Sequence, residues 1–388
     1  MPTTLDLTAV REQLPSTQAA AYLNTGTAGP LPIATARVMA EEARAELETG
    51  RIRPDGFPKL RERIDALRAD LAAAVGAGPG AAALTQGTTV GMNIAIHGLA
   101  WSPGDEVVTT TQEHGGALLP LYVLHRRHGV KVTFAEVGNG GADEALEGLK
   151  KAIRPGVKAV VVSHVLYTTG AVLPLQEISE LAHAAGATVI VDGAQSVGAI
   201  AVDAPALGAD AYAFSGQKWL LGPESTGGLY VREDRLDDWE LTFVSFMGVD
   251  HDRYRWDDPS ALFPAAHAGR FQFALPYRPS VAGLSSSLAW VRGEVGREAA
   301  YARIAENAHY CWERAHELPG VEVLTPAGQL AGLVAFKVPG RDLQQTVERL
   351  AANQVLIRSI PENGAFRIST GFFNTQAEID RALELIAT

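Results

Sequence analysis

From about Ala81 onward, short strand-like runs alternate with helix-like stretches. The run "AAALTQG" precedes the helical "TTVGMNIAIHGLA", "DEVVTTTQEH" precedes "GGALLPLYVLHRRHG", and "VKAVVVSHV" leads into "LQEISELAHAAG". Apolar runs separated by helices indicate βαβ crossovers, which build a mainly parallel sheet with helices on both faces. We therefore predict an α/β fold whose large domain contains such a sheet.

The alternating pattern changes near Pro279, where a long helical stretch over residues 280–318 begins. A smaller mixed tail of strand-like and helical segments follows it. We predict a large domain over residues 22–278 and a smaller α+β C-terminal domain over residues 279–388. Residues 1–21 are expected to pack against the smaller domain.

Charge and composition exclude several classes of protein. The formal net charge is −11, which argues against a nucleic-acid or anionic-membrane binder, because phosphate contacts need clustered Lys and Arg. No apolar run is long enough to span a bilayer, and the first residues lack the pattern of a signal peptide. The single cysteine, Cys311, excludes an intrachain disulfide and fits a reducing compartment. We expect a soluble, cytoplasmic protein.

Lys218 lies between two predicted strands, in "SGQKWLLGPESTGGLYV". Buried lysines are uncommon, because the charge is costly unless it is paired or used chemically. Taken alone, Lys218 could equally be a surface-turn lysine whose ammonium reaches water. A functional role for it therefore depends on what the rest of the chain provides.

Asp192, in "VIVDGAQSVG", follows an apolar strand, and the carboxyl ends of parallel strands are where ligands bind in open α/β sheets. By itself the carboxylate could merely cap the next helix. A buried acid at one strand end and a lysine after the following strand are the two charges that a pyridinium cofactor needs. The lysine forms a Schiff base, and the acid keeps the ring nitrogen protonated.

A phosphate site should accompany such a pair. The stretch "TQGTTVGMN" places Gly87, Thr88 and Thr89 at a strand-to-helix turn, where free N–H groups and the helix dipole favour an anion. The same residues could be no more than an N-cap. His114 follows another strand in "TTTQEHGG", so its ring could stack on a flat cofactor.

The series "QGTTVGMN", "EHGG", "SHVLYTTGAVLPL", "VDGAQSVGAI" and "DAYAFSGQKWLLGPESTGGLYV" resembles the class V aminotransferase family of pyridoxal-phosphate enzymes. This family includes cysteine desulfurases, C–S lyases and isopenicillin N epimerases. The resemblance runs in order from "YLNTGTAGPLP" to "FRISTGFFNT". It implies a fold-type-I enzyme with pyridoxal 5'-phosphate as cofactor, a small amino-acid substrate, and a homodimer with active sites at the subunit interface. No metal ion is expected.

The resemblance also assigns roles to individual residues. Lys218 would be the Schiff-base lysine, Asp192 the partner of the pyridine nitrogen, and Gln195 the contact to the ring hydroxyl. His114 would stack on the ring. The phosphate would be held by Thr88, Thr89 and Ser215.

Three positions depart from the family's usual residues. Gln217 precedes the lysine where the family usually has histidine, although its amide can still donate to a phosphate. Leu275 replaces the threonine that reaches the partner subunit's phosphate, which leaves that contact open. Tyr167 stands where desulfurases usually carry asparagine, and the C–S lyases resemble this chain in having an aromatic residue there.

Arg367, in "AFRIST", matches the family arginine that binds the substrate's α-carboxylate, for which a guanidinium fork is well suited. Arg358, in "VLIRSI", is a second candidate nine residues upstream. Each could instead be an ordinary surface arginine on an edge strand. Tyr167 and Asn24 are also expected among the substrate-binding residues.

Desulfurases carry a nucleophilic cysteine between these two arginines, whereas the segment here, "SIPENGA", is short and has none. Cys311 lies in a helical stretch, where a buried structural thiol is the default. We therefore expect a C–S β-lyase acting on L-cysteine, cystine or a cysteine S-conjugate. Lys218 would remove the Cα proton, and an aminoacrylate would decay to pyruvate and ammonia.

Epimerisation, transamination and decarboxylation on the same scaffold stay open, because the bond broken depends on which Cα substituent stands perpendicular to the cofactor ring. A non-catalytic sensor or scaffold is the other class of hypothesis. It is disfavoured because Lys218 and Asp192 are both present and no basic helix-turn-helix segment is visible.

Overall fold

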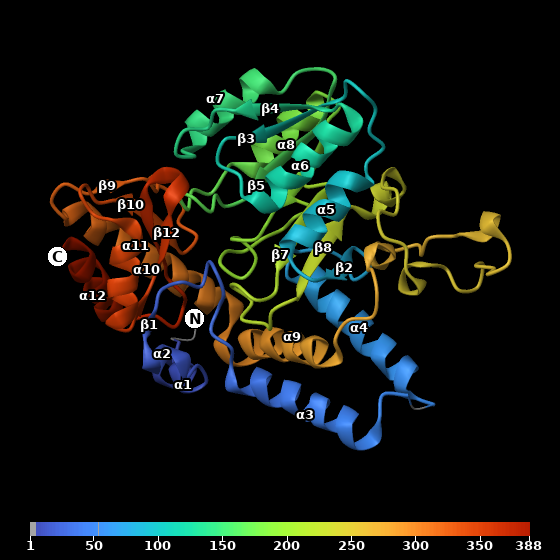
Figure 1. The fold of residues 1–388 in the computed structure, drawn as a ribbon, viewed down its shortest axis with the longest axis horizontal. Coiled ribbons are helices and arrows are strands. Elements are labelled where there is room, and N and C mark those ends of the chain that lie inside the picture. The colour runs from blue at the N-terminus through green and yellow to red at the C-terminus, as the bar shows by residue number, and fades with distance from the viewer. Residues whose placement is uncertain (1–4, 53) are drawn as a thin grey trace.

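The computed structural model describes residues 5–52 and 54–388. Its centre is a seven-stranded sheet in the order β2-β8-β7-β6-β5-β3-β4 (Figure 1). Strand β8 is antiparallel to both of its neighbours, and the remaining pairs are parallel, so the predicted mainly parallel α/β sheet is confirmed. The strands are β2 (Ala82–Thr85), β3 (Glu106–Thr110), β4 (Lys131–Ala135), β5 (Val157–Ser163), β6 (Thr188–Asp192), β7 (Ala211–Ser215) and β8 (Gly227–Val231).

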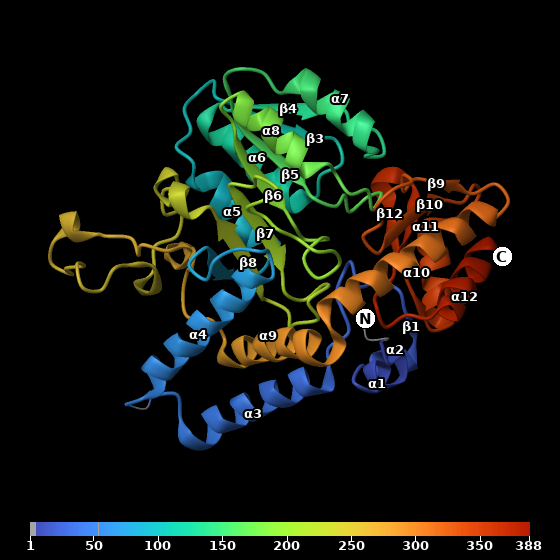
Figure 2. The ribbon, with the colours of Figure 1, turned by 180° about the vertical axis from the view of Figure 1, so that it is seen from behind.

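Helices cover both faces of this sheet (Figures 1 and 2). Successive residues of β5 show how the faces separate, since Val160 belongs to one hydrophobic core and Val161 to the other. Leu149 and Ile178 line the first core, and Met92 and Leu121 line the second. These residues come from α7 (Ala142–Ala152), α8 (Leu175–Ala184), α5 (Thr88–Gly98) and α6 (Gly115–His128) respectively.

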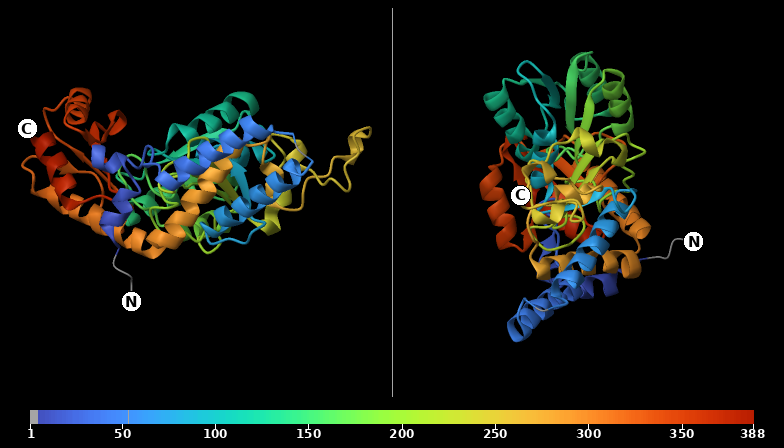
Figure 3. Two further views of the ribbon diagram at one scale, coloured as in Figure 1. Left: turned by 90° about the horizontal axis from the view of Figure 1, so that it is seen from below. Right: turned by 90° about the vertical axis from the view of Figure 1, so that its right-hand side faces the viewer.

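Three further helices lie below the sheet in the view of Figure 1. They are α3 (Ile33–Thr49), α4 (Gly56–Ala73) and α9 (Arg278–Trp290). Residues 239–277, which we call the arm, lead from the sheet to α9. The middle of the arm projects from the body of the molecule (Figures 1 and 3), whereas its two ends pack on the body, with Trp239 and Phe271 in a hydrophobic core. The only regular elements of the arm are the 3-10 turns η2 (Phe246–Gly248), η3 (Pro259–Ala261) and η4 (Ala268–Phe271); η1 (Glu233–Asp238) precedes it.

The C-terminal part contains a four-stranded antiparallel sheet in the order β12-β13-β10-β9. Its strands are β9 (Glu322–Val323), β10 (Leu333–Lys337), β12 (Arg358–Ile360) and β13 (Ala365–Ser369). The accompanying helices are α10 (Arg297–Glu317), α11 (Leu343–Ala352) and α12 (Gln376–Ala387), with the 3-10 turn η6 (Pro361–Asn363) between β12 and β13. No helix in the described part of the chain is both long and apolar enough to cross a bilayer.

The long helical stretch predicted over 280–318 is divided in two. Helix α9 ends at Trp290, a π-helical turn (η5) covers Val291–Val295, and α10 begins after Gly296. Gly296 has a φ of 81°, a left-handed conformation that glycine adopts without the steric cost of a Cβ. The chain therefore changes direction between α9, which packs on α3, and α10, which packs on the C-terminal sheet.

The first described residues lie beside the C-terminal part of the chain (Figure 1). They form α1 (Leu7–Glu12), α2 (Ser16–Ala19) and β1 (Ala21–Tyr22). Strand β1 pairs in parallel with β11 (Val355–Leu356), and the Arg11 guanidinium lies 2.9 Å from the Glu378 carboxylate. The division into domains at 22–278 and 279–388 stays a prediction.

Candidate active site

The carboxyl ends of β2, β3, β6 and β7 meet at one edge of the large sheet, as parallel strands require. A cavity of about 260 Å³ opens there. It is lined by Gly26, Thr27, Gln86, Gly87, Thr88, Thr89, Val90, His114, Asp192, Ala194, Ser215, Gln217, Lys218 and Arg358. Most of the predicted site residues therefore surround one space, although they come from widely separated parts of the sequence.

Lys218 follows β7 and reaches into this cavity from a tight turn. Burial, together with the positive charges of Arg367 and Arg358, lowers the pKa of Lys218 to about 8, while Asp192 opposes the shift. A lysine whose pKa lies this low has an appreciable neutral fraction near neutral pH. Only the neutral amine is a nucleophile or a base.

Asp192 is the last residue of β6 and is almost completely buried. Burial raises the pKa of Asp192, while a hydrogen bond from the Ala194 backbone and the nearby Lys218 act in the opposite direction. The Ala194 N–H donates to Oδ1 over 2.9 Å. This hydrogen bond fixes one oxygen of the Asp192 carboxyl group. The group also lies close enough to Lys218 and His114 for the charges of the three side chains to influence one another.

His114 is the N-cap of α6, and its Nδ1 accepts a hydrogen bond of 3.0 Å from the Gly116 N–H. Because Nδ1 is an acceptor, the neutral ring carries its proton on Nε2. Burial lowers the pKa of His114, and the positive charge of Lys218 adds to this effect. The ring of Tyr167 meets the His114 ring edge-on at a centroid distance of 5.0 Å.

The start of α5 offers donors for an anion. Gly87, at its N-cap, has a φ of 138°, which side-chain-bearing residues rarely adopt. The Thr88 hydroxyl lies 2.7 Å from the Ser215 hydroxyl, and the Thr88 N–H donates to Ser215 Oγ over 3.2 Å. The next N–H groups, of Thr89 and Val90, belong to the first turn, whose donors have no partner inside a helix.

Gln217 and Gln195 differ in how many hydrogen bonds their side-chain amides already form. The Gln217 side-chain oxygen is buried and has no hydrogen-bond partner among the described residues. Gln195 lies outside the cavity lining: its Nε2 donates to the Gly26 carbonyl over 2.8 Å, and its oxygen accepts from the Trp219 indole over 2.9 Å. Only its second N–H is left for the predicted contact to the ring hydroxyl.

The two arginines face each other across a hairpin, since Arg358 of β12 is paired in register with Arg367 of β13. Arg358 lines the cavity, while Arg367 is fully buried just behind the lining. Arg367 Nη1 donates to the Tyr167 carbonyl over 2.9 Å, but its Nε and Nη2 have no partner among the described residues. Burial lowers the pKa of Arg367 to about 9, and Arg358 contributes to the shift.

Asn24 and Cys311 take no direct part in the cavity lining. Asn24 Oδ1 accepts a hydrogen bond of 2.8 Å from the Thr27 hydroxyl, and its backbone forms a bridge with Ser369. Cys311 is fully buried on α10, where burial raises the pKa of its thiol. A raised pKa suppresses the reactive thiolate, as expected for a structural cysteine.

Sequence reasoning missed Glu113, a buried residue directly before His114. Its carboxyl group accepts hydrogen bonds from the Thr110 hydroxyl (2.8 Å), the Ser163 N–H (3.0 Å) and the Ser163 hydroxyl (2.5 Å). Burial raises the pKa of Glu113 to about 7, and the nearby Asp192 adds to the shift. An acidic residue three positions after the end of β3 and directly before His114 was the available signal. Through these hydrogen bonds the Glu113 carboxyl group connects the C-terminal ends of β3 and β5 beside the site.

The site residues fit pyridoxal phosphate. A neutral-prone lysine can bond to its aldehyde, a buried acid can pair with its ring nitrogen, and the donors at the start of α5 suit its phosphate. Together with the sheet order, this arrangement defines the class of pyridoxal-phosphate enzymes of fold type I.

The comparisons with known proteins agree. The sequence profile described as Aminotransferase class-V matches residues 55–382, so the chain belongs to this family. A solved complex of the cystine C–S lyase C-DES with its product cysteine persulfide superimposes with a TM-score of 0.90 at 29% identity, over 97% of this chain and 99% of that one. A variant of C-DES, with glycine covalently linked to its pyridoxal-phosphate cofactor, gives the same score and identity.

Curated relatives carry two kinds of name. "Isopenicillin N epimerase" of Streptomyces clavuligerus is 29% identical over 94% of this chain and 93% of that protein. "Probable cysteine desulfurase" of Mycolicibacterium paratuberculosis is 31% identical over 78% of this chain, which spans only 45% of that relative. The predictions of the family, the fold type and the cofactor are confirmed: this is a pyridoxal-phosphate-dependent enzyme, of the lyase class at the level of the family.

Proposed function

We propose that the protein is a C–S β-lyase that cleaves L-cysteine, cystine or a cysteine S-conjugate. One observation carries the proposal: the hairpin bearing Arg358 and Arg367 is closed by a single 3-10 turn, Pro361–Asn363, that contains no cysteine. A desulfurase of this family would use a cysteine thiol at that place to accept the sulfur. A site with the lysine and the acid but no thiol is suited to elimination.

Each site residue has a role that follows from its position. Arg367 holds the substrate's α-carboxylate with its unpartnered Nε and Nη2, a charge-assisted pairing that also compensates its own burial. Asp192 holds a proton at the cofactor's ring nitrogen. Pyridoxal phosphate held by these residues would supply the electron sink for the charge that develops at Cα. Lys218, whose pKa of about 8 makes it an effective base near neutral pH, takes the Cα proton.

The remaining residues hold and enclose the cofactor. Thr88, Thr89 and Ser215 bind its phosphate at the start of α5, with Gln217 beside them. His114 packs on the ring, and its orientation is fixed by the Gly116 hydrogen bond and the edge of Tyr167. Gln195 contributes its one free N–H to the ring hydroxyl. Arg358 and Asn24 complete the substrate side.

Elimination from cystine breaks the Cβ–S bond, and the sulfur leaves with the bonding electrons as a persulfide. Addition of water then gives pyruvate and ammonia, so cystine and water become cysteine persulfide, pyruvate and ammonia without an oxidant or a reductant. The complex of C-DES with cysteine persulfide supports a substrate of this kind, because that relative aligns over nearly the whole chain.

Epimerisation is the second candidate, favoured by the near full-length similarity to isopenicillin N epimerase. It needs the same Cα proton transfer as elimination but returns the proton to the opposite face. Transamination and decarboxylation would use the same cofactor site.

Product analysis separates these reactions. Cysteine, cystine, several cysteine S-conjugates and simple L-amino acids are incubated with the holoenzyme without any added reductant or keto acid. We expect equal amounts of pyruvate, ammonia and the sulfur product from at least one of the sulfur compounds. Accumulation of alanine, of a D-amino acid, or of carbon dioxide with an aldehyde would instead indicate desulfuration, epimerisation or decarboxylation, and would overturn the lyase proposal.

We also infer that the enzyme is a homodimer in which the arm meets a second copy. Gln86 lines both the active-site cavity and an adjoining cavity of about 280 Å³, whose wall includes Leu275 and Tyr277 of the arm. The amide of Gln272, also on that wall, is buried and has no partner among the described residues. The arm exposes large apolar side chains that a partner would cover: Phe243, Val244, Phe246, Trp256, Leu262, Phe273, Leu275 and Tyr277.

A further inference from the structure

Residues 22–29, which we call the strap, run from β1 to the loop that carries Lys218. Near its start the strap is bound to β13, because the Ser369 N–H donates to the Leu23 carbonyl over 2.8 Å. At its end the Gly29 N–H donates to the Gln217 carbonyl over 2.8 Å. The strap therefore spans the space between the strand that carries Arg367 and the turn that carries the catalytic lysine.

The middle of the strap approaches Arg367 closely at Gly26. A Cβ atom added to Gly26 would lie 3.0 Å from Arg367 Nη2 and 2.9 Å from Ser369 Oγ. Both of these atoms are buried and have no hydrogen-bond partner among the described residues. The backbone of the strap therefore forms a wall against this side of the guanidinium, and it limits the access of water to Arg367 Nη2.

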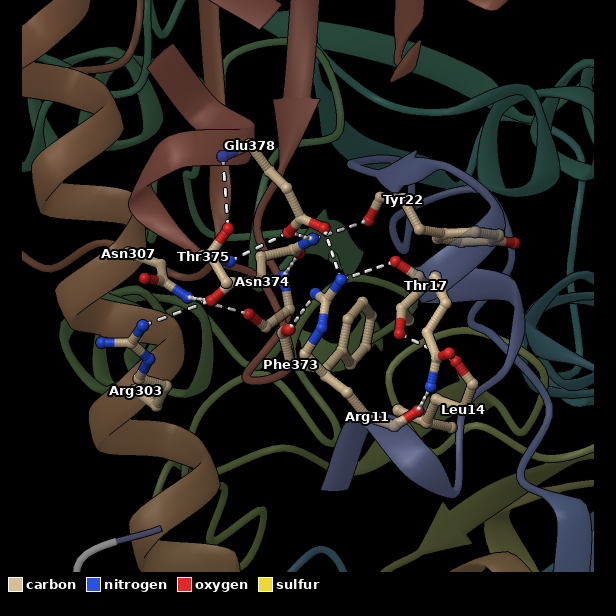
Figure 4. A network of polar contacts seen from close by, with 12 residues as sticks. Arg11, Leu14, Thr17, Tyr22, Arg303, Asn307, Phe373, Asn374, Thr375 and Glu378 are labelled. Carbon is tan, nitrogen blue, oxygen red and sulfur yellow. Dashed lines mark hydrogen bonds and ion pairs between the residues drawn. The ribbon is translucent and has the colours of Figure 1, made fainter. Parts of the chain in front are cut away.

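A short series of hydrogen bonds holds this wall in place. The Tyr22 hydroxyl donates to the Ala28 carbonyl over 3.0 Å, which joins the two ends of the strap. The Tyr22 carbonyl in turn accepts from Asn374 Nδ2 over 3.1 Å, as Figure 4 shows. Asn374 follows β13 by five positions, so the strap is tied to the same segment that carries Arg367.

Asn374 is itself firmly held in the network of Figure 4. It is fully buried, its Oδ1 accepts from the Gly371 N–H over 2.7 Å, and its Nδ2 also donates to the Glu378 carboxylate over 3.1 Å. Glu378 closes a capping box at the start of α12 and forms an ion pair of 2.9 Å with Arg11. This network gives the strap a rigid support outside the active site.

We propose that Tyr22 and Asn374 are positioning residues for the substrate's carboxylate. They keep the strap at the depth that leaves Arg367 Nε and Nη2 open to a carboxylate but shielded from water. Loss of the Tyr22–Ala28 bond lets water compete for the guanidinium, which weakens substrate binding.

The proposed Schiff-base lysine, the acid and the phosphate donors come from α5, β6 and the turn after β7, and the contacts of the strap to Gln195 and Gln217 use backbone atoms of Gly26 and Gly29. We therefore expect cofactor affinity to change much less than carboxylate binding. The inference rests on the proposed role of Arg367.

The test is Tyr22→Phe in the holoenzyme, read out as the dissociation constant of L-alanine, titrated through the visible absorbance of the bound cofactor. We expect a rise of roughly three- to tenfold, the effect of one lost hydrogen bond, with a much smaller change in cofactor affinity. With a substrate, KM rises by a similar factor while kcat stays within about twofold. Tyr310→Phe is the matched control, because it removes a hydroxyl bonded to Asp380 in the same half of the molecule and should leave both constants unchanged.

Two further variants show whether the effect passes through Arg367. In an Arg367→Lys background, Tyr22→Phe should have no further effect on alanine binding. Gly26→Ala, which removes no hydrogen bond but crowds Arg367 Nη2, should weaken alanine binding even more than Tyr22→Phe. Equal losses from Tyr22→Phe in both backgrounds, or an effect on cofactor affinity with alanine binding unchanged, would overturn the proposal. Because alanine has no sulfur to eliminate, these outcomes are independent of the lyase assignment.

Discussion

Lys218 shows how a single environment would prepare a residue for the two tasks that we propose for it. Burial makes its ammonium form unfavourable, while Asp192 keeps a compensating charge nearby. The balance leaves a pKa of about 8, which lies close to the pH at which an amine must both bond to an aldehyde and accept a proton. The pKa values of Asp192 and His114 are shifted in the directions that burial dictates for an acid and a base.

A pH dependence follows for the attachment of the cofactor to the apoprotein. Only neutral Lys218 attacks the aldehyde, and the neutral fraction grows as pH rises toward a pKa of about 8. The rate constant for covalent attachment should therefore increase up to about that pH and level off above it. It is measured from the visible absorbance after mixing, and borohydride followed by peptide mass spectrometry should place the adduct on Lys218. A rate that is constant from about pH 6 to pH 9, or an adduct in Lys218→Ala, would contradict this role.

Residue identities gave the candidate site, but not all of its contacts. Lys218, Asp192 and His114 could be found because each follows an apolar run, and parallel strands bring such ends together. The engagement of Gln195 could not be found, because its partners Gly26 and Trp219 are joined to it only by the folded chain.

At the scale of elements, the start of α5 is where we propose that the cofactor's phosphate binds. Gly87 is held at a φ of 138°, which is strained for any residue with a side chain, although an added Cβ would make only ordinary contacts with Ser215 Oγ and the Thr226 carbonyl. The helix can present its first N–H groups to a phosphate only while this backbone conformation is kept.

Gly87→Ala should therefore weaken cofactor affinity by about tenfold or more, since backbone strain of this kind costs about 1–3 kcal/mol. Gly156→Ala is the matched control: Gly156 also has a left-handed φ, 96°, and no crowding at an added Cβ, but it lies outside the cavity lining. Both variants should lose some thermal stability, and only Gly87→Ala should release the cofactor on dialysis. Equal retention of the cofactor by the two variants would argue against the phosphate site.

Two elements could not be predicted from the sequence. Residues 280–318 read as one helical stretch, but a π-helical turn at Val291–Val295 separates α9, which packs on α3, from α10, which packs on the C-terminal sheet. The strap has no periodic pattern, and its position is fixed by hydrogen bonds from Asn374 and Ser369, which lie more than three hundred residues later. Contacts of that range leave no local signal.

At the scale of the whole molecule, the arm exposes apolar surface that would stay in contact with water if the protein were a monomer. It carries a row of exposed apolar side chains and borders the cavity next to the active site. Exposed apolar patches of this kind mark interaction surfaces in soluble proteins. The proposed dimer would bury the arm and complete the wall of the site.

Replacing Phe246 and Trp256 by serine should shift the protein from dimer to monomer in sedimentation equilibrium, because both side chains are largely exposed. The monomer should also release pyridoxal phosphate more readily, since the arm borders the cavity that contains Gln86. Phe134→Ser is the control, an exposed aromatic on the edge strand β4 at the opposite side of the sheet. A wild-type protein that sediments as a monomer with its cofactor bound would rule out the dimer.

The central claim is that sulfur leaves the substrate without passing through a cysteine of this chain. Cystine turnover by the wild type and by Cys311→Ala, which removes the only thiol, tests it directly. We predict that both proteins release pyruvate, ammonia and cysteine persulfide in equal amounts and at similar kcat, because Cys311 is buried in the core beside α12. Alanine as the main product, or a folded Cys311→Ala variant that keeps its cofactor but has lost turnover, would contradict the account.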